Sequence, residues 1–359
     1  MSQVKEVKKH IIAGSAIKTF DFFIQWHLTE RCNLRCRHCY QGRKKVPEMT
    51  PEEVKQEIDG ATEMFQAWED EHGISVSPSI HFTGGEPLLY QGLWDVLTYA
   101  KEKGFGVAMM SNGCLITKED GEKILDIGIS DVQISLEGPP DLHDSIRGKG
   151  SFSKAAKGVQ HLVSAGSRVS ANVTLTRLNV DQIEETVEVA KGMGFYGIGF
   201  SRMVPCGSGK ELFDSLLTPQ ELKDAYQKVI ALNHPSFEVV SGDPLAGTLM
   251  ESAIPVGCNL TLGGCSAGFS GVTITSDGSV MACRRIGLVV GNLKKRSLRS
   301  IWASSKLLWQ LRKRESYDGK CGQCSQWPSC RGCRAVAYAY SVTQGQPDLF
   351  ADDPQCWRP

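Results

Sequence analysis

The chain has 359 residues, enough for two domains with a sizeable buried core. Its 40 basic residues balance its 40 acidic ones, so no overall charge attracts nucleic acid or an anionic membrane surface. The first residues lack the apolar core of a signal peptide, and the longest uncharged stretch, 252–276, holds too many glycines and hydroxyl side chains for a membrane helix. We therefore expect a cytoplasmic protein with no nucleic-acid or membrane partner.

Short β-rich runs alternate with helical patterns between residues 20 and 205, which is typical of βα units around a parallel sheet. The segment Thr50-Pro51-Glu52-Glu53 predicts the start of the first helix. It combines an N-cap, a proline at the first helical position and acids that suit the helix dipole. Strands are expected near 22–28, 79–83, 106–111, 131–136, 168–175 and 197–203. Further helices are expected near 92–103, 118–126, 152–165 and 181–193.

Six units are too few for an eight-stranded barrel. The predicted fold class is therefore α/β, a partial (β/α)6 TIM-like barrel, with functional groups at the C-terminal ends of its strands. Beyond it we expect a helix near 218–233 and a β-hairpin over 272–283 that turns at Asp277-Gly278. The predicted divisions are an N-terminal extension (1–19), the barrel (20–205), a bridging helical segment (206–250) and a cysteine-rich domain with the hairpin and short helices (251–359).

Thirteen cysteines in a chain expected to stay reduced favour metal ligation over disulfides. Cys32, Cys36 and Cys39 share one short loop after the first strand. A cubane [4Fe-4S] cluster has four irons, so three thiolates leave one iron open to a small molecule. The alternative is part of a zinc site or a group of reactive thiols. Structural zinc sites usually take four ligands in paired groups, however, and His38 lies between two of the cysteines.

The C-x3-C-x2-C loop resembles the signature of the radical S-adenosylmethionine (AdoMet) superfamily. The resemblance implies that AdoMet chelates the open iron and is cleaved reductively to a 5′-deoxyadenosyl radical, which removes a hydrogen atom from a substrate in the barrel mouth. It assigns no catalytic residue beyond the cofactor ligands. It further implies AdoMet contacts at Tyr40, Asn112 and Met203.

A second match follows the second expected strand, at Gly84, Gly85, Glu86 and Pro87. Paired glycines let the backbone approach a ligand closely, and a Glu86 carboxylate could accept a hydrogen bond from an ammonium group. The segment is similar to the superfamily segment that binds the AdoMet amino group. A turn with a helix-capping glutamate is the alternative.

A third match follows the fourth strand. Ser135 and Arg147 occupy the places that contact the AdoMet carboxylate or ribose in related peptide-modifying enzymes, and Glu137 replaces the usual aspartate. The alternative for Arg147 is a surface ion pair with Asp141 or Asp144.

The C-terminal cysteines resemble the pattern of SPASM domains, although the Cys330 to Cys333 interval is one residue short. The resemblance implies two auxiliary [4Fe-4S] clusters, and it leaves Cys114 and Cys206 as free thiols. Four-cysteine zinc ribbons are the alternative. The implied ligands are Cys258, Cys265, Cys283 and Cys333 for one cluster, and Cys321, Cys324, Cys330 and Cys356 for the other.

The resemblance implies a peptide maturase that acts on a ribosomally made peptide. Its implied partners are a peptide substrate and a one-electron donor such as flavodoxin or ferredoxin. Because few residues precede Cys32, a leader peptide is expected to bind elsewhere on the protein or through a separate leader-binding protein. Arg284 and Arg285 follow Cys283 where sulfatase maturases carry an aspartate base, which disfavours formylglycine formation. The alternatives are a tetrapyrrole side-chain modifying enzyme of the haem d1 type, whose propionates the arginine pair would suit, and a non-catalytic iron-sulfur carrier.

Overall fold

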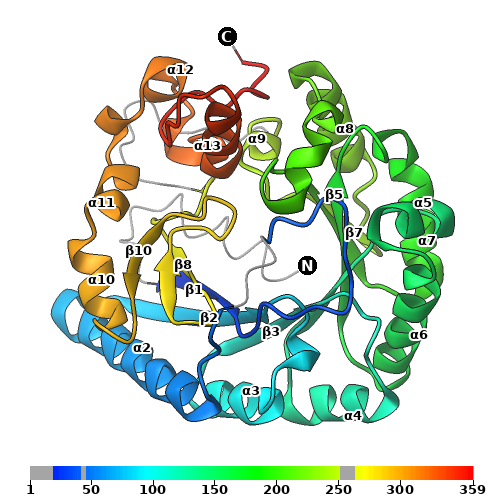
Figure 1. Ribbon diagram of the computed structural model, residues 1–359, viewed down its shortest axis with the longest axis horizontal. Coiled ribbons are helices and arrows are strands. Elements are labelled where there is room, and N and C mark those ends of the chain that lie inside the picture. The colour runs from blue at the N-terminus through cyan, green and yellow to red at the C-terminus, as the bar shows by residue number, and fades with distance from the viewer. Residues whose placement is uncertain (1–18, 42–45, 251–262, 359) are drawn as a thin grey trace.

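The computed structural model describes residues 19–41, 46–250 and 263–358. Its strands form a single curved sheet in the order β10-β9-β8-β1-β2-β3-β4-β5-β6-β7, and Figure 1 shows helices packed around its outer side. Strands β1 to β8 pair in parallel, whereas β9 and β10 are antiparallel to their neighbours. The strands are β1 (Thr19–His27), β2 (Ser75–Thr83), β3 (Gly106–Ser111), β4 (Asp131–Ser135), β5 (Val169–Leu175), β6 (Gly197–Arg202), β7 (Glu238–Val240), β8 (Gly271–Ile274), β9 (Ser279–Met281) and β10 (Val289–Asn292).

The helices mostly follow the strands one by one. Thr50 caps the first of them with the predicted capping box, since the Glu53 amide donates to its hydroxyl and the Glu53 carboxylate accepts from its amide. The α-helices are α2 (Pro51–His72), α3 (Leu93–Glu102), α4 (Lys118–Ile127), α5 (Pro140–Arg147), α6 (Ser151–Ser164), α7 (Ile183–Met193), α8 (Pro219–Ala231), α9 (Pro244–Gly247), α10 (Leu298–Ser304), α11 (Lys306–Arg312), α12 (Gly319–Gln323) and α13 (Arg334–Thr343). Short 3-10 turns are η1 (Pro87–Leu89), η2 (Val180–Gln182), η3 (Gly207–Ser215), η4 (Arg314–Ser316) and η5 (Trp327–Ser329).

The six expected strands and the hairpin are present, but the sheet is larger than predicted. Strand β7 extends it on one side, and the hairpin β8–β9 joins it on the other through parallel pairing of β8 with β1. Gly271 permits that pairing because a Cβ there would lie 2.4 Å from the Phe23 ring. Helix α5 was not predicted, because Pro139-Pro140 favours a turn and also suits the first positions of a helix.

Two buried contacts join the C-terminal part to the barrel. On one side, Trp302 of α10 meets Phe22 of β1 edge to face, with ring centroids 4.9 Å apart. On the other, the Arg202 guanidinium at the end of β6 contacts Asp243 Oδ2 at 2.7 Å and Asp353 Oδ2 at 2.5 Å. Burial raises the pKa of Asp353, but Arg202 outweighs it and lowers the pKa, so this carboxylate stays ionised.

No helix in the described ranges is long and apolar enough to cross a membrane.

The Arg202 contacts predict a stability effect. Replacing Arg202 with Met leaves two buried carboxylates without their cation, so the free energy of unfolding should fall by about 3–5 kcal/mol. Urea unfolding of the anaerobic protein measures this. Arg177→Met is the matched control, because its pair with Glu221 is exposed and should matter far less. Equal losses in the two variants would contradict the prediction.

Candidate functional site

The cysteine loop, residues 28–41, lies across the edge of the sheet where the parallel strands end. The Gly85 amide donates to the Thr29 carbonyl at 2.7 Å, and the Glu86 amide donates to the Arg31 carbonyl at 2.8 Å. These bonds continue the pairing of β1 with β2 beyond the strands themselves. The loop therefore starts from a fixed position at the C-terminal edge, where barrels of this kind place their reactive groups.

Two further contacts hold the other half of the loop. The Arg37 amide donates to the Ile146 carbonyl in α5 at 2.9 Å, and the Ser208 amide after β6 donates to the Cys39 carbonyl at 2.8 Å. The loop is thus tied to segments on both sides of the barrel mouth.

Gly84 and Gly85 are required by this packing. A Cβ on Gly84 would lie 2.5 Å from the Thr29 carbonyl oxygen, and one on Gly85 would lie still closer to that of Arg31. The sequence prediction placed a ligand against these glycines. In the structure the backbone of the cysteine loop occupies that space, so the close approach is between two protein segments.

The Glu86 carboxylate joins the ends of β2 and β3. It is fully buried and accepts from the Ser111 hydroxyl at 2.8 Å, the Asn112 amide at 2.9 Å and the Leu88 amide at 3.4 Å. Burial raises its pKa to about 7. The helix-capping contact considered as the alternative is present, and one acceptor position on Oε2 is left for the ammonium group that the sequence analysis expects there.

Glu137 and Arg147 form a buried ion pair beneath the cysteine loop. The guanidinium donates to Glu137 Oε1 through Nε at 2.9 Å and Nη2 at 2.5 Å, and the Thr174 amide donates to Oε2 at 3.0 Å. His38 Nε2 also lies 2.8 Å from Oε1, without hydrogen-bond orientation. Burial raises the pKa of Glu137, but His38 and Arg147 lower it to about 2, so the carboxylate is ionised.

Arg147 consequently does not pair with either nearby aspartate, which corrects the alternative considered for it. Its remaining terminal nitrogen, Nη1, points to Cys36 Sγ at 3.9 Å. The longer carboxylate at position 137 therefore serves to hold this arginine beside a thiol of the cysteine loop.

The other expected AdoMet contacts lie at neighbouring strand ends. The Asn112 side-chain amide points to Cys32 Sγ at 3.8 Å, so it supports the loop directly. Ser135 ends β4 with a half-buried hydroxyl that has no partner among the described residues. Met203 is only 1% exposed, and its amide donates to Leu175.

Tyr40 and Pro87 are less suited than the residues above to bind a ligand through polar groups. Burial raises the pKa of the Tyr40 hydroxyl, so it stays neutral, and its ring meets His27 edge to face. Pro87 is buried at the first position of η1.

The donor groups directed at Cys32 and Cys36 fit an anionic cluster. Besides Asn112 and Arg147, the Leu34 amide donates to Cys32 Sγ at 3.5 Å. Polar donors directed at cysteine sulfurs stabilise thiolates and tune an attached cluster. No group of three His, Cys, Asp or Glu side chains in the described ranges is arranged to hold a single metal ion.

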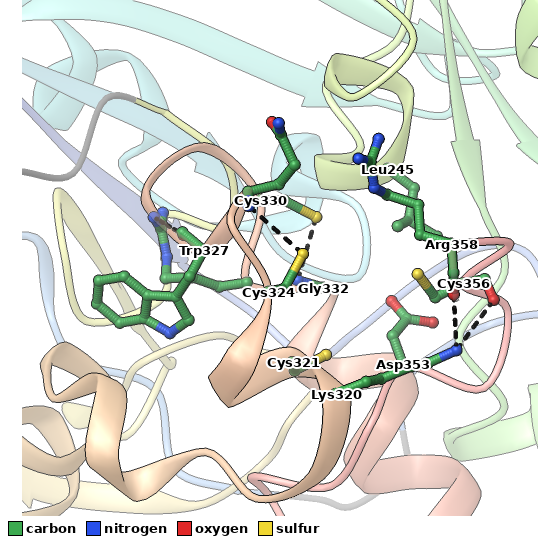
Figure 2. A pocket seen from close by; sticks show the side chains of 12 residues that line it. Leu245, Lys320, Cys321, Cys324, Trp327, Cys330, Gly332, Asp353, Cys356 and Arg358 are labelled. Atoms are coloured by element: carbon green, nitrogen blue, oxygen red, sulfur yellow. Dashed lines mark hydrogen bonds between the residues drawn. The ribbon is translucent and has the colours of Figure 1, made fainter. Parts of the chain in front are cut away.

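Four C-terminal cysteines line one hollow in the SPASM-like region, and Figure 2 shows their sulfur atoms around it. The Gly332 amide donates to Cys330 Sγ at 3.3 Å, and the Gln326 amide donates to Cys324 Sγ at 3.4 Å. Such a hollow and such donors suit a fully ligated cluster. The four residues are Cys321, Cys324, Cys330 and Cys356.

The other expected cluster is described only in part. Cys265, Cys283 and Cys333 pack against a common hydrophobic cluster, whereas Cys258 lies outside the described residues. Cys206 packs against the same cluster, and its thiol lies 4.0 Å from the Tyr40 carbonyl.

Both leftover thiols are half-buried. Burial raises the pKa of Cys114 and of Cys206 to about 11. Cys114 contacts the carbonyls of Asn112 and Ser151 at 3.8 and 3.5 Å, so it packs against the strand end.

The two arginines after Cys283 differ in their surroundings. Arg284 contacts Glu30 Oε2 at 2.6 Å and is neutralised by it. Arg285 makes no ion pair or hydrogen bond within the described ranges. Burial lowers its pKa, but the neighbouring thiolates of Cys283 and Cys333 more than offset this.

Sequence reasoning missed His38 as a neighbour of Glu137, and it missed Arg331 and Arg334. The sequence held a signal for the two arginines, because both lie directly after cysteines in Cys-Arg-Gly-Cys-Arg. The His38 contact had none, since it joins segments about a hundred residues apart.

Comparison with known proteins agrees with this geometry. Residues 26–190 match the radical SAM superfamily, and residues 265–334 match the SPASM iron-sulfur cluster-binding domain. A mycofactocin maturase, MftC of Mycolicibacterium smegmatis, is 30% identical over 346 residues, which cover 93% of this chain and 82% of that protein. The chain belongs to the radical SAM superfamily and carries a SPASM domain. It is a radical SAM enzyme whose cofactors are AdoMet and [4Fe-4S] clusters.

Other proteins similar to this chain are named for different functions. An AdoMet-dependent heme synthase of Oleidesulfovibrio alaskensis is 29% identical over 355 residues, covering 93% of this chain and 86% of that protein. Among solved structures, Streptococcus suis SuiB bound to its precursor peptide SuiA has the same fold, with a TM-score of 0.73 and 18% identity over 99% of this chain and 79% of that one.

Proposed function

We propose that Cys32, Cys36 and Cys39 hold the [4Fe-4S] cluster that binds AdoMet. The observation that carries this is the fixed loop at the C-terminal edge of the sheet, with polar donors directed at its thiols. When bound, the cluster and AdoMet together supply a 5′-deoxyadenosyl radical that removes a hydrogen atom from a substrate.

The surrounding residues divide into positioning and binding groups. Glu86 and Asn112 position the loop through hydrogen bonds within the protein. The Ser135 hydroxyl has no partner among the described residues, and Arg147 Nη1 has a second N–H besides the one directed at Cys36, so these two groups bind the AdoMet carboxylate.

Two auxiliary clusters complete the assignment. The hollow lined by four cysteines supports one of them. The common packing of Cys265, Cys283 and Cys333 supports the other, with Cys258 as its fourth ligand. All irons of both clusters are then ligated, which suits electron transfer.

The substrate is a ribosomally made peptide. Support comes from 30% identity with a mycofactocin maturase across almost the whole chain. Formylglycine formation remains disfavoured, since Arg284, paired with Glu30, follows Cys283 where sulfatase maturases carry an aspartate base.

A tetrapyrrole substrate is the second candidate, and Arg285 favours it. This guanidinium has no carboxylate partner among the described residues, so it suits a propionate or another carboxylate of a substrate. The similarity to a heme synthase points the same way.

An acidic electron-transfer protein such as a flavodoxin or ferredoxin delivers the electron to the cysteine loop. Support comes from an open hollow of about 510 Å³ that Cys36 lines together with Arg35, Arg37 and Lys210. None of these three cations has an ion pair among the described residues. One acid, Glu211, lies there as well, so the net charge favours an acidic partner.

AdoMet cleavage should depend on the cysteine loop. Anaerobic Cys36→Ala protein with dithionite should form at least a hundred-fold less 5′-deoxyadenosine than the wild type, because the cluster loses a ligand. Cys114→Ala should behave like the wild type, since its thiol contacts only carbonyls. Chromatography of the nucleoside measures both, and wild-type yields from Cys36→Ala would refute the assignment.

Substrate class should be visible in the products. With the wild-type enzyme, a peptide encoded by a short reading frame beside its gene should increase 5′-deoxyadenosine formation and change in mass, whereas iron coproporphyrin III should do neither. Mass spectrometry after anaerobic incubation measures this. Turnover of the porphyrin alone, lost in Arg285→Gln, would instead establish the tetrapyrrole function.

The electron-donor site should respond to charge. Arg37→Glu should slow AdoMet cleavage driven by reduced flavodoxin by about ten-fold or more at low salt, while the dithionite-driven rate stays unchanged. Arg299→Glu is the control, because Arg299 contacts Glu71 in the last turn of α2, away from the cysteine loop. Equal slowing with both reductants would contradict the proposal.

A further inference from the structure

Arg331 lies between the segments that carry ligands of the two auxiliary clusters. Its side chain is buried, with 2% exposure, and Nη2 donates to the carbonyls of Gly263 and Cys265. Nη1 donates to the Pro328 carbonyl at 2.8 Å, in the turn that leads to Cys330. Cys265 belongs to one proposed cluster and Cys330 to the other.

This buried cation has no carboxylate partner in the described ranges. Its Nε has no hydrogen-bond partner, and its other nitrogens meet only carbonyl oxygens. The guanidinium also lies over the Phe269 ring, 4.1 Å from the centroid. Carbonyls and an aromatic face offset part of the cost of burying a charge, but they supply no opposite charge.

The backbone at this position is also unfavourable. Arg331 has a φ of 63°, and it is the only non-glycine residue with positive φ among those described. Glycine would relieve the strain at that φ. A long cationic side chain in a strained and buried position points to a role for the side chain itself.

Arg334 repeats the pattern three residues later. It is 1% exposed, Nη2 donates to Cys321 Sγ at 3.6 Å, and Nη1 donates to the Ala351 carbonyl at 2.7 Å. It too has no carboxylate pair among the described residues, and its Nε is unpartnered.

The acidic side chains nearby already have other partners within the protein. Asp353 binds Arg202 with both oxygens, at 2.8 and 2.5 Å, and Asp243 completes that cluster of charges. Asp352 accepts from the Cys321 amide at 2.8 Å. No acid among the described residues forms an ion pair with Arg331 or Arg334.

We propose that the auxiliary iron-sulfur clusters are the counter-charge of these arginines, and that Arg331, placed between the two clusters, raises the reduction potentials of both. This inference rests on the proposed cluster ligands. Four thiolates outweigh the charge of a cubane core, so each cluster is anionic and becomes more so when it accepts one electron. A nearby fixed cation stabilises the reduced form most, which makes the potential more positive. Arg334 acts mainly on the cluster held by Cys321.

The test uses anaerobic holoenzyme and redox titrations monitored by electron paramagnetic resonance. In Arg331→Gln, both auxiliary midpoint potentials should shift to more negative values. In Arg331→Lys, which keeps the charge, they should stay near the wild type. Arg334→Gln should shift only one of them. The potential of the AdoMet-binding cluster should not change in any variant.

Arg312→Gln is the matched control. Arg312 is half-buried, donates to the Gly268 carbonyl at 2.6 Å and lies 4.0 Å from the Trp302 ring centroid, yet it bonds to no cysteine segment. Auxiliary potentials of Arg331→Gln that equal those of Arg312→Gln would overturn the inference.

The iron and sulfide content of the wild type and the variants distinguishes the remaining outcomes. Iron and sulfide analysis of the wild type should give about 12 of each per chain, for three cubanes; a much lower wild-type value would refute the proposed ligands instead of the role of Arg331. If Arg331→Gln loses auxiliary clusters and Arg331→Lys keeps them, the charge is required and the inference stands. If both variants lose them, the side chain acts through its shape and the inference fails.

Discussion

Two backbone hydrogen bonds, from Gly85 to Thr29 and from Glu86 to Arg31, fix the cysteine loop against the end of β2. They form only because neither glycine carries a Cβ at the contact. The Glu86 carboxylate then binds the end of β3, whose Asn112 supports Cys32, so one carboxylate links two strand ends to the loop. The thiols are therefore held by the rigid edge of the sheet, which is where the fold places its chemistry.

Arginines are distributed around the thiols in two different ways. At the first site, Arg147 reaches Cys36 while Glu137 neutralises it and holds its orientation. In the SPASM domain, Arg331 and Arg334 are buried with no carboxylate partner in the part of the chain that the structure describes, whereas Arg202 has two. The contrast follows from function: Arg202 joins two parts of the fold, and a structural cation needs its counter-ions in the protein. A cation without them implies an anionic group in the same space.

Local sequence patterns were sufficient for much of the fold. The capping box at Thr50 and the Asp277-Gly278 turn appear where they were expected, because caps and turns depend on neighbouring residues. The parallel pairing of β8 with β1 could not be foreseen, since nothing in periodicity identifies a partner strand about 250 residues away. At the site, cysteine spacing indicated the proposed cluster ligands. It could not show that Glu86 faces inward, because the same Gly-Gly-Glu-Pro segment permits either orientation.

The central claim is that one iron beside the cysteine loop lacks a protein ligand and binds AdoMet. Electron-nuclear double resonance on the reduced enzyme with AdoMet labelled by 15N at its amino group and 17O at its carboxylate tests it most directly. The account predicts hyperfine coupling from both labels to one iron of the cluster. An absence of coupling in protein with full iron content, or zinc in place of iron and labile sulfide, would contradict it.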